Sequence, residues 1–206
     1  MPITDTSGKN LPVMETFYSI QGEGANTGKA AFFLRIGGCD VGCYWCDVKE
    51  SWNAGLHPLR DVDEIVEEAL GYAGRSVVVT GGEPLLYNLN YLTSSFIAKG
   101  FVLFLETSGS EPLSGTWNWI CLSPKRKAPP QPEILMNANE LKVIIFEEAD
   151  FEWARSFVSL VKPECLLYIQ PEWSRCEKMM PSLVEFVMKN PSWMISLQSH
   201  KYMRIP

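Results

Sequence analysis

Short apolar runs recur along this chain, and each ends in a turn or in polar residues. The eight runs are METFYSI, AFFLRI, SVVVT, FVLFLET, WICLS, LKVIIF, CLLYIQ and WMISLQ. Runs of this length, rich in Val, Ile, Phe and Tyr, are typical of β-strands. Four of the stretches between them have apolar residues at helical spacing, namely residues 61–72, 88–99, 150–161 and 178–189. The prolines between residues 124 and 132 predict a loop.

Alternation of strands with helices predicts parallel pairing through right-handed crossovers. Because the helices are too few for eight complete units, we expect an α/β fold of the incomplete, modified (β/α) barrel type. A chain of 206 residues without a repeat or a flexible linker is expected to form a single domain over residues 1–206. Asp150 stands at the start of the third helical stretch and is expected to be its N-cap.

Polar groups follow five of the strand-like runs. They are Gly81-Gly82-Glu83, Glu106-Thr107-Ser108, Ser123-Pro124-Lys125, Gln170, and Gln198-Ser199-His200. In barrels of this kind the C-terminal ends of the strands meet at one mouth, where active sites are built. Five such groups together favour an enzyme over a purely structural domain.

Three cysteines lie within eight residues, directly after the run AFFLRIGG. Thiolates as close as those of Cys39, Cys43 and Cys46 suit zinc or an iron–sulfur cluster. Structural zinc needs four ligands, and a noncatalytic zinc-binding interaction module with His57 as the fourth ligand is the alternative. Three cysteines without a second C-x-x-C pair favour a cubane cluster with one open iron. The scattered Cys121, Cys165 and Cys176 are expected to be structural.

Charge and hydropathy exclude several classes of partner. A net charge of −6 argues against nonspecific binding to nucleic acid, which needs a basic surface. No apolar run approaches the roughly 18–20 residues that cross a bilayer, so no membrane partner is expected. The N-terminus lacks the features of a signal peptide. We therefore expect a cytoplasmic protein, whose thiols stay reduced.

Two motifs resemble the radical S-adenosylmethionine superfamily. One is C-x-x-x-C-x-x-C with Trp45 before its last cysteine, and the other is Gly81-Gly82-Glu83-Pro84 after the run SVVVT. The resemblance implies a barrel of the radical S-adenosylmethionine type and a [4Fe–4S] cluster whose open iron binds S-adenosylmethionine. The cofactor-binding positions that it implies are Trp45, Asp47, Gly82, Glu83, Ser123, Pro124, Lys125 and Gln170.

The two ends of the chain indicate one family within this superfamily. Gln21-Gly22-Glu23, Arg35 and the stretch from His200 to Pro206 resemble the 7-carboxy-7-deazaguanine synthase family, from Glu15 to the last residue. That family converts 6-carboxy-5,6,7,8-tetrahydropterin to 7-carboxy-7-deazaguanine with release of ammonia, in queuosine and deazapurine biosynthesis. The resemblance also implies a homodimer and a flavodoxin-like electron donor. A glycyl-radical activating enzyme, which uses the same cysteine spacing, is the alternative within the superfamily.

The resemblance assigns the substrate to an N-terminal loop (about residues 11–24) and a C-terminal tail (about residues 198–206). An arginine fork suits the substrate carboxylate, and the amide and carboxylate of Gln21 and Glu23 suit the aminopyrimidinone edge. The terminal carboxylate of Pro206 is expected to close over the substrate. The substrate-binding positions are Ile20, Gln21, Gly22, Glu23, Arg35, Thr80, His200 and Pro206.

One position departs from the family pattern. The family commonly has Thr or Ser two residues after the last cysteine, where the hydroxyl helps to hold Mg²⁺. Here Val48 stands at that position and offers no oxygen, although Mg²⁺ prefers about six oxygen ligands. We therefore assign metal-ligand roles to Cys39, Cys43 and Cys46 alone, and the Mg²⁺ requirement is doubtful.

Overall fold

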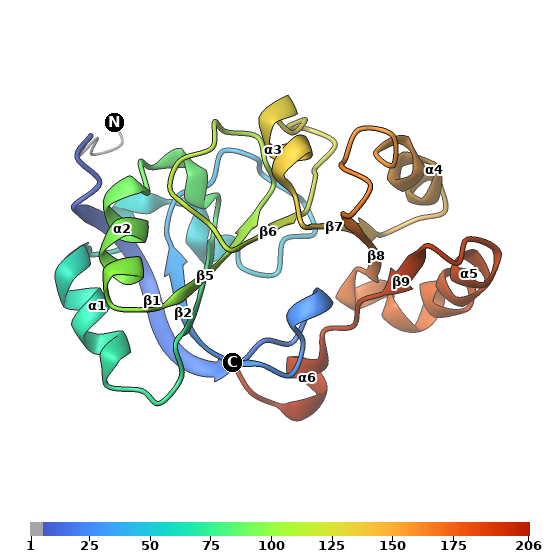
Figure 1. The fold of residues 1–206 in the computed structure, drawn as a ribbon. Coiled ribbons are helices and arrows are strands. Elements are labelled where there is room, and N and C mark those ends of the chain that lie inside the picture. The colour runs from blue at the N-terminus through green and yellow to red at the C-terminus, as the bar shows by residue number, and fades with distance from the viewer. Residues whose placement is uncertain (1–5) are drawn as a thin grey trace.

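Nine strands form one open sheet in the computed structural model, which describes residues 6–206 (Figure 1). The order across the sheet is β3-β1-β2-β4-β5-β6-β7-β8-β9. The strands are β1 (Asn10–Ile20), β2 (Ala30–Ile36), β3 (Leu59–Asp61), β4 (Ser76–Gly81), β5 (Val102–Thr107), β6 (Trp119–Leu122), β7 (Glu140–Ile145), β8 (Leu166–Pro171) and β9 (Trp193–Ile195). Within these residues the edge strands β3 and β9 do not pair, so the expected incomplete barrel is confirmed.

The sheet is parallel from β2 to β9, but β1 runs antiparallel to both β2 and β3. The expectation of parallel pairing throughout is therefore wrong at this edge. The connection between β1 and β2, residues 21–29, is shorter than the dozen or more residues that a parallel crossover needs. A short connection returns the chain as a hairpin, and this places the residue 21–24 loop beside the ends of the parallel strands.

Within residues 6–206, five α-helices lie around the outside of the curved sheet, and a sixth lies at the C-terminal end of the chain (Figure 1). They are α1 (Val62–Leu70), α2 (Asn90–Ala98), α3 (Pro132–Asn137), α4 (Ala149–Ser156), α5 (Cys176–Lys189) and α6 (Ser199–Met203). The four predicted helices are confirmed as α1, α2, α4 and α5. The short α3, α6 and β3 were not predicted, because they have too few residues to show a periodicity.

Asp150 is not the N-cap of α4, contrary to the prediction from sequence. The N-cap is Glu148, and Asp150 lies in the first turn of the helix. Its carboxylate instead accepts hydrogen bonds from the backbone N–H groups of Phe146 (2.9 Å) and Glu147 (3.0 Å), and from Arg126 (2.8 Å). The Asp150 side chain therefore stabilises the turn between β7 and α4 and connects it to the loop that carries Arg126.

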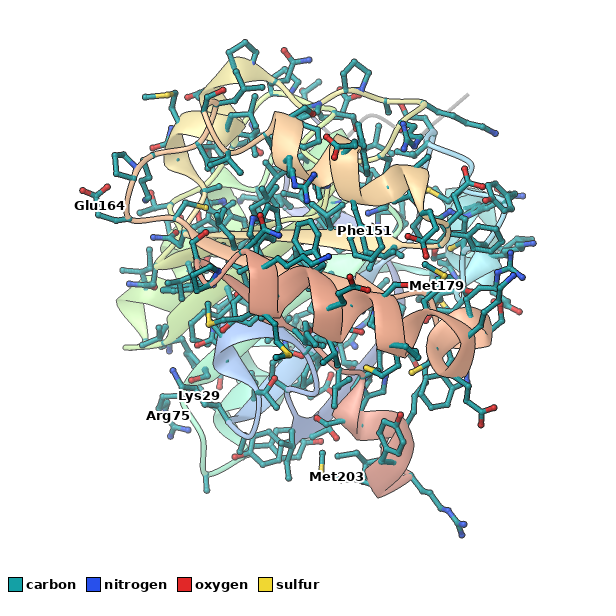
Figure 2. The ribbon with its side chains drawn as sticks, turned by 90° about the vertical axis from the view of Figure 1, so that its right-hand side faces the viewer. Lys29, Arg75, Phe151, Glu164, Met179 and Met203 are labelled. Atoms are coloured by element: carbon teal, nitrogen blue, oxygen red, sulfur yellow. The ribbon has the colours of Figure 1, made fainter. Side chains whose placement is uncertain are left out.

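Alternation of side chains along the strands divides the core into two parts. The larger part lies between the sheet and the helices. On that flank α5 runs beside α4, and Phe151 stacks on Phe186 with ring centroids 4.9 Å apart (Figure 2). The smaller part lies on the inner face and comprises Ala31, Phe33, Val78 and Phe104. It fills the inner face near the strand beginnings and leaves the strand ends for polar side chains.

Among residues 6–206, none of the helices has both the length and the apolar character needed to cross a membrane.

Candidate active site

A cavity of about 570 Å³ opens at the C-terminal ends of the parallel strands. This volume lies within the usual range for small-molecule sites. The structure gathers most of the predicted site residues around it. They are Ile20, Gln21, Gly22, Glu23, Arg35, Cys39, Cys43, Trp45, Cys46, Asp47, Val48, Thr80, Gly82, Ser123, Lys125, Gln170, His200 and Pro206. Glu83 and Pro124 do not line the cavity.

The cysteine loop follows β2 and is closed at its base by backbone hydrogen bonds. Gly38 N–H donates to Ser51 O (2.6 Å), and Cys39 N–H donates to Trp52 O (3.1 Å). Within the loop, Cys46 N–H donates to Cys43 O (3.1 Å). Both ends of the loop are thus anchored, and all three cysteines line the same cavity.

The chemistry of the three thiols fits an iron–sulfur cluster. Cys39, Cys43 and Cys46 are all free and half-buried. Burial raises the pKa of Cys39 and Cys43, so metal binding must displace their protons. Residues 6–206 hold no group of three or more His, Cys, Asp or Glu side chains that converge on a single ion. A cubane does not require such convergence, because each thiolate binds a different iron.

The zinc alternative gains no support from the position of His57. The His57 ring packs against Gly37, and its Nε2 lies 2.9 Å from Glu50 O. His57 does not line the cavity that the three cysteines share. Of the remaining cysteines, Cys121 and Cys165 are buried as expected, and Cys176 is half-buried at the start of α5.

The Gly-Gly turn after β4 lies directly against the backbone that leads into the cysteine loop. Gly82 N–H donates to Ile36 O (3.0 Å), and Glu83 N–H donates to Gly38 O (2.8 Å). Gly81 has a φ of +142°, which favours glycine. A Cβ atom on Gly82 would lie 2.1 Å from Gly38 O and 2.8 Å from Cys39 Cβ. The Gly-Gly turn and the start of the cysteine loop therefore pack so closely that position 82 has no room for a side chain.

Glu83 is buried beneath this turn, with 1% of its surface exposed. One carboxylate oxygen accepts from Thr107 Oγ1 (2.6 Å) and Leu85 N–H (3.1 Å). The other accepts from Ser108 N–H (2.8 Å) and Ser108 Oγ (2.5 Å). Three of these hydrogen bonds tie Glu83 to the end of β5, and the fourth is local, so together they hold the Gly-Gly turn in place.

Ser123, Lys125 and Gln170 also line the cavity. Lys125 Nζ donates to Ser123 Oγ (2.7 Å) and lies 5.7 Å from the centroid of the Trp45 ring. Burial lowers the pKa of Lys125, and its attraction to Cys43 opposes that shift. Gln170 Oε1 accepts from Ser196 Oγ (2.6 Å), which fixes its amide. A cation and fixed polar groups thus face the cysteine loop.

Arg35 and Thr80 are neighbours on β2 and β4, paired in the parallel register. Arg35 Nε donates to Glu15 Oε1 (2.7 Å), and 19% of the arginine side chain is exposed. The pairing orients the guanidinium on the inner face of the sheet, where it lines the cavity. Its position suits an anionic group of a ligand.

The loop after β1 and the tail of the chain pack against each other. Ser199 N–H (2.9 Å) and Ser199 Oγ (2.8 Å) both donate to Gly22 O. The His200 ring lies so close to Gly22 that a Cβ there would be 2.3 Å from Nδ1. Burial lowers the pKa of His200. At the other end of the tail, Ser19 Oγ donates to Pro206 O (3.3 Å). The tail thus closes one side of the cavity.

Several cavity residues were not assigned a role from the sequence. Lys142 Nζ lies 2.7 Å from Glu23 Oε2 and 3.0 Å from Glu106 Oε2. Lys201 Nζ lies 3.3 Å from Asp47 Oδ2, so the tail also contacts the cysteine loop. The signal for Lys142 was a lysine inside the otherwise apolar run LKVIIF. The sequence showed Glu106 as a carboxylate at the end of a predicted strand, but no neighbouring residue indicated that Lys142 would be its partner.

The cysteine loop does not fit a Mg²⁺ site. Val48 has no side-chain oxygen, and its carbonyl accepts from Ser51 Oγ (2.7 Å). Asp47 Oδ2 faces Lys201 and also Gln198 Nε2 (3.4 Å). The loop thus lacks the array of free oxygens that Mg²⁺ prefers, and no step below depends on this ion.

Comparison with known proteins identifies the family. Residues 34–119 match the model of the radical SAM superfamily. The chain is 53% identical to a 7-carboxy-7-deazaguanine synthase of Flavobacterium psychrophilum, an alignment that covers 97% of this chain and 94% of the relative. It is 45% identical to the synthase of the same name from Synechocystis sp., with 99% and 98% covered. The chain belongs to the 7-carboxy-7-deazaguanine synthase family.

A solved structure agrees with this assignment. The crystal structure of QueE from Escherichia coli superimposes with a TM-score of 0.83 at 28% sequence identity, over 95% of this chain and 96% of that one. The chain is therefore an enzyme with the radical SAM fold, and a [4Fe–4S] cluster and S-adenosylmethionine are its cofactors. Neither the zinc-binding module nor the glycyl-radical activating enzyme is favoured by these relatives.

Replacing Gly82 with alanine is expected to lower activity at least about 100-fold, because displacements near 1 Å in a catalytic site can cost that much. The added Cβ would press on Gly38 O and Cys39 Cβ and shift the cysteine loop. Iron per chain after anaerobic reconstitution and turnover of S-adenosylmethionine measure the effect. Gly71→Ala, at a helical φ of −65° after α1, is the control and is expected to match the parent protein. Full activity of Gly82→Ala would contradict the need for bare backbone at this contact.

Proposed function

We propose that this chain converts 6-carboxy-5,6,7,8-tetrahydropterin to 7-carboxy-7-deazaguanine with release of ammonia, as a carbon–nitrogen lyase of queuosine and deazapurine biosynthesis. The observation that carries the proposal is one cavity that is lined by two chemically different sets of residues. One set is Cys39, Cys43 and Cys46, and the other includes Glu23 and Arg35. We further propose that the chain acts as one domain, because all nine strands belong to one sheet.

The cysteine set suits the cofactors. The three thiolates would hold the cluster, leaving one iron for the amino and carboxylate groups of S-adenosylmethionine. The bare backbone at Gly82, the amide of Gln170 and the Ser123–Lys125 pair surround the remaining space. When bound, the reduced cluster and S-adenosylmethionine supply a carbon-centred radical that takes hydrogen from the substrate. The protein's own part is to hold both molecules at contact distance and to exclude water.

The other set suits the pterin. Arg35 would bind the substrate carboxylate, and Gln21 and Glu23 would bind the aminopyrimidinone edge. Burial alone would raise the pKa of Glu23, but Lys142, together with hydrogen bonds from Gln198 and Gln170, lowers it to about 2. Glu23 therefore accepts hydrogen bonds as a carboxylate across the whole physiological pH range. His200 and Pro206 would close over the substrate from the tail.

Replacing Arg35 with lysine is expected to raise KM for the carboxylated pterin about 10- to 100-fold, with a smaller change in kcat. Lysine keeps the charge but loses the planar fork, and one hydrogen bond to a charged group contributes roughly 1.5–3 kcal/mol. Steady-state kinetics measure the effect. Arg75→Lys is the control, because Arg75 lies at the edge of the molecule, where it donates to the carbonyls of Tyr72 and Gly74 and lies over the Phe101 ring (Figure 2). An unchanged KM in Arg35→Lys would contradict the carboxylate-binding role.

The function itself is tested by anaerobic reconstitution with iron and sulfide. The protein is incubated with S-adenosylmethionine, a reductant and 6-carboxytetrahydropterin, and the products are read by mass spectrometry. Formation of 7-carboxy-7-deazaguanine with little accumulated 5′-deoxyadenosine supports the proposal. Deoxyadenosine without the deazaguanine would indicate radical chemistry on another substrate, and neither product from a cluster-loaded protein would overturn the proposal. Parallel reactions with added Mg²⁺ and with EDTA show whether Val48 has removed the family's metal requirement.

The proposed partners are an electron donor and a second copy of the chain. A flavodoxin-like donor needs access to the cluster, and Tyr44 in the cysteine loop is 60% exposed. The homodimer follows from the family resemblance. The proposed cytoplasmic location follows from the sequence, and a reducing compartment keeps the three thiols available for iron. Light scattering of the reconstituted protein tests the homodimer, and reduction of the cluster by purified flavodoxin tests the donor.

A further inference from the structure

Lys142 is a buried cation on the inner face of the sheet. It lies on β7 with 4% of its side chain exposed, in a strand whose neighbouring residues are apolar. Its ammonium contacts two carboxylates that come from distant parts of the chain, Glu23 in the loop after β1 and Glu106 on β5. A charge as buried as this one requires paired partners, and both partners line the cavity.

Each of the two carboxylates is also held by an amide at its other oxygen. Gln21 Nε2 donates to Glu106 Oε1 (3.1 Å), and Gln198 Nε2 donates to Glu23 Oε1 (2.9 Å). Lys142 therefore stands between the substrate loop, the tail and the sheet. If the cation were removed, two half-buried carboxylates would be left next to each other without the charge that contacts both.

The surroundings of Lys142 keep it charged. The titratable groups that face it are Glu23 from the loop after β1, Glu106 on β5, Cys121 on β6 and Glu140 on β7, with Lys125 and His200 as the nearby bases. Burial alone would lower the pKa of Lys142, but the acidic groups raise it well above its ordinary value. Glu140 is itself tied down, because it accepts from Ala25 N–H (3.1 Å) and Trp119 Nε1 (3.1 Å).

We propose that Lys142 is a positioning residue, whose ammonium holds Glu23 and Glu106 as a pair of fixed, ionised acceptors for the N–H groups of the bound heterocycle. The proposal rests on the proposed function, because it takes the pterin as the ligand. Two carboxylates that share a buried site without a cation keep one proton between them. One of the two acceptors would then become a donor, and the N–H-rich edge of the pterin would meet the wrong partner.

Lys142→Met tests the proposal, since methionine is unbranched and of similar length. Near neutral pH its kcat/KM for 6-carboxytetrahydropterin is expected to fall about 100-fold, within the range for truncating one partner of a buried charge pair. The loss is expected to diminish as the pH rises toward 9. Without Lys142, only the hydrogen bonds from Gln198 and Gln170 oppose the rise in the pKa of Glu23 that burial causes, so the shared proton leaves only at higher pH. The parent protein, in which the pKa of Glu23 is about 2, is expected to show no such fall in kcat/KM as the pH is lowered from 9 to neutral, that is, no acid limb in its pH profile.

Two further variants separate positioning from a structural role. Lys142→Arg keeps the cation and is expected to retain a pH profile without the acid limb, whatever its rate. Lys142→Gln keeps a hydrogen-bond donor but no charge, and is expected to show the same acid limb as Lys142→Met; it replaces that variant if methionine prevents folding. Lys162→Met, a surface lysine that donates to Asn137 O (3.3 Å), is the control. Iron content and S-adenosylmethionine binding are measured for every variant.

The outcomes distinguish this proposal from the proposed function. If the parent protein makes no deazaguanine, the function is wrong. If the parent protein is active and a neutral variant keeps its kcat/KM with an unchanged pH profile, the positioning role is wrong and the function stands. Equal losses at every pH in the Arg, Gln and Met variants would also overturn the positioning role, because they would show that Lys142 only supports the fold.

Discussion

Cys43→Ala is expected to abolish formation of the deazaguanine, a loss of at least about 10⁶-fold, the lower end of enzymatic acceleration. The cofactors carry the chemistry that the protein cannot supply, and two thiolates cannot hold the cluster in its three-ligand form. The protein is expected to remain folded, because Cys43 is half-buried in a loop that is anchored at its base through Gly38 and Cys39. Iron content, the brown colour of the cluster and product formation measure the effect.

The matched control is Cys176→Ala. Cys176 is also a free, half-buried cysteine, but it lies at the start of α5 and contacts Tyr202 Oη at 3.8 Å. Its replacement is expected to leave iron content and activity unchanged. Activity of Cys43→Ala without a cluster would rule out the radical mechanism, and a loss of iron in Cys176→Ala would place a cluster ligand outside the loop.

Glu83→Gln is expected to destabilise the protein by about 2–3 kcal/mol, the cost of a buried polar group that is left without a partner. Both carboxylate oxygens accept from a backbone N–H, one from Leu85 and the other from Ser108. Whichever way the new amide turns, its NH₂ group must face one of these donors. For a chain of this size the melting temperature is expected to fall by about 5–10 °C. Thermal unfolding of the cluster-free protein measures the effect without a contribution from metal binding.

The substitution is also expected to weaken S-adenosylmethionine binding, because Glu83 holds the Gly-Gly turn against the cysteine loop. Glu64→Gln makes the same chemical change at an exposed position on α1, where effects stay within about 0.5 kcal/mol. An unchanged melting temperature with weakened cofactor binding would mean that Glu83 contacts the cofactor directly. No change in either measurement would contradict both roles.

Most of the secondary structure of this chain can be predicted from the sequence. The eight apolar runs are strands and the four periodic stretches are helices, because burial of one face imposes a period on neighbouring residues. The cysteine loop is equally local, since its three thiols lie within eight residues and follow one strand. The polar groups at the strand ends meet at one cavity for a simple reason. Parallel strands bring all their C-terminal ends to the same edge of the sheet.

Contacts between distant residues were decided only by the tertiary structure. Lys142 and Glu23 are 119 positions apart, and nothing near either residue indicates the other. The hydrogen bonds from Thr107 and Ser108 to Glu83, the pairing of β1 with β3 and the ion pair between Asp47 and Lys201 are of the same kind. The sequence by itself determined the strand pattern and the family, and it predicted the cluster ligands. The tertiary structure decided which charges face each other, because a buried charge is matched by whatever side chain the packed sheet brings beside it.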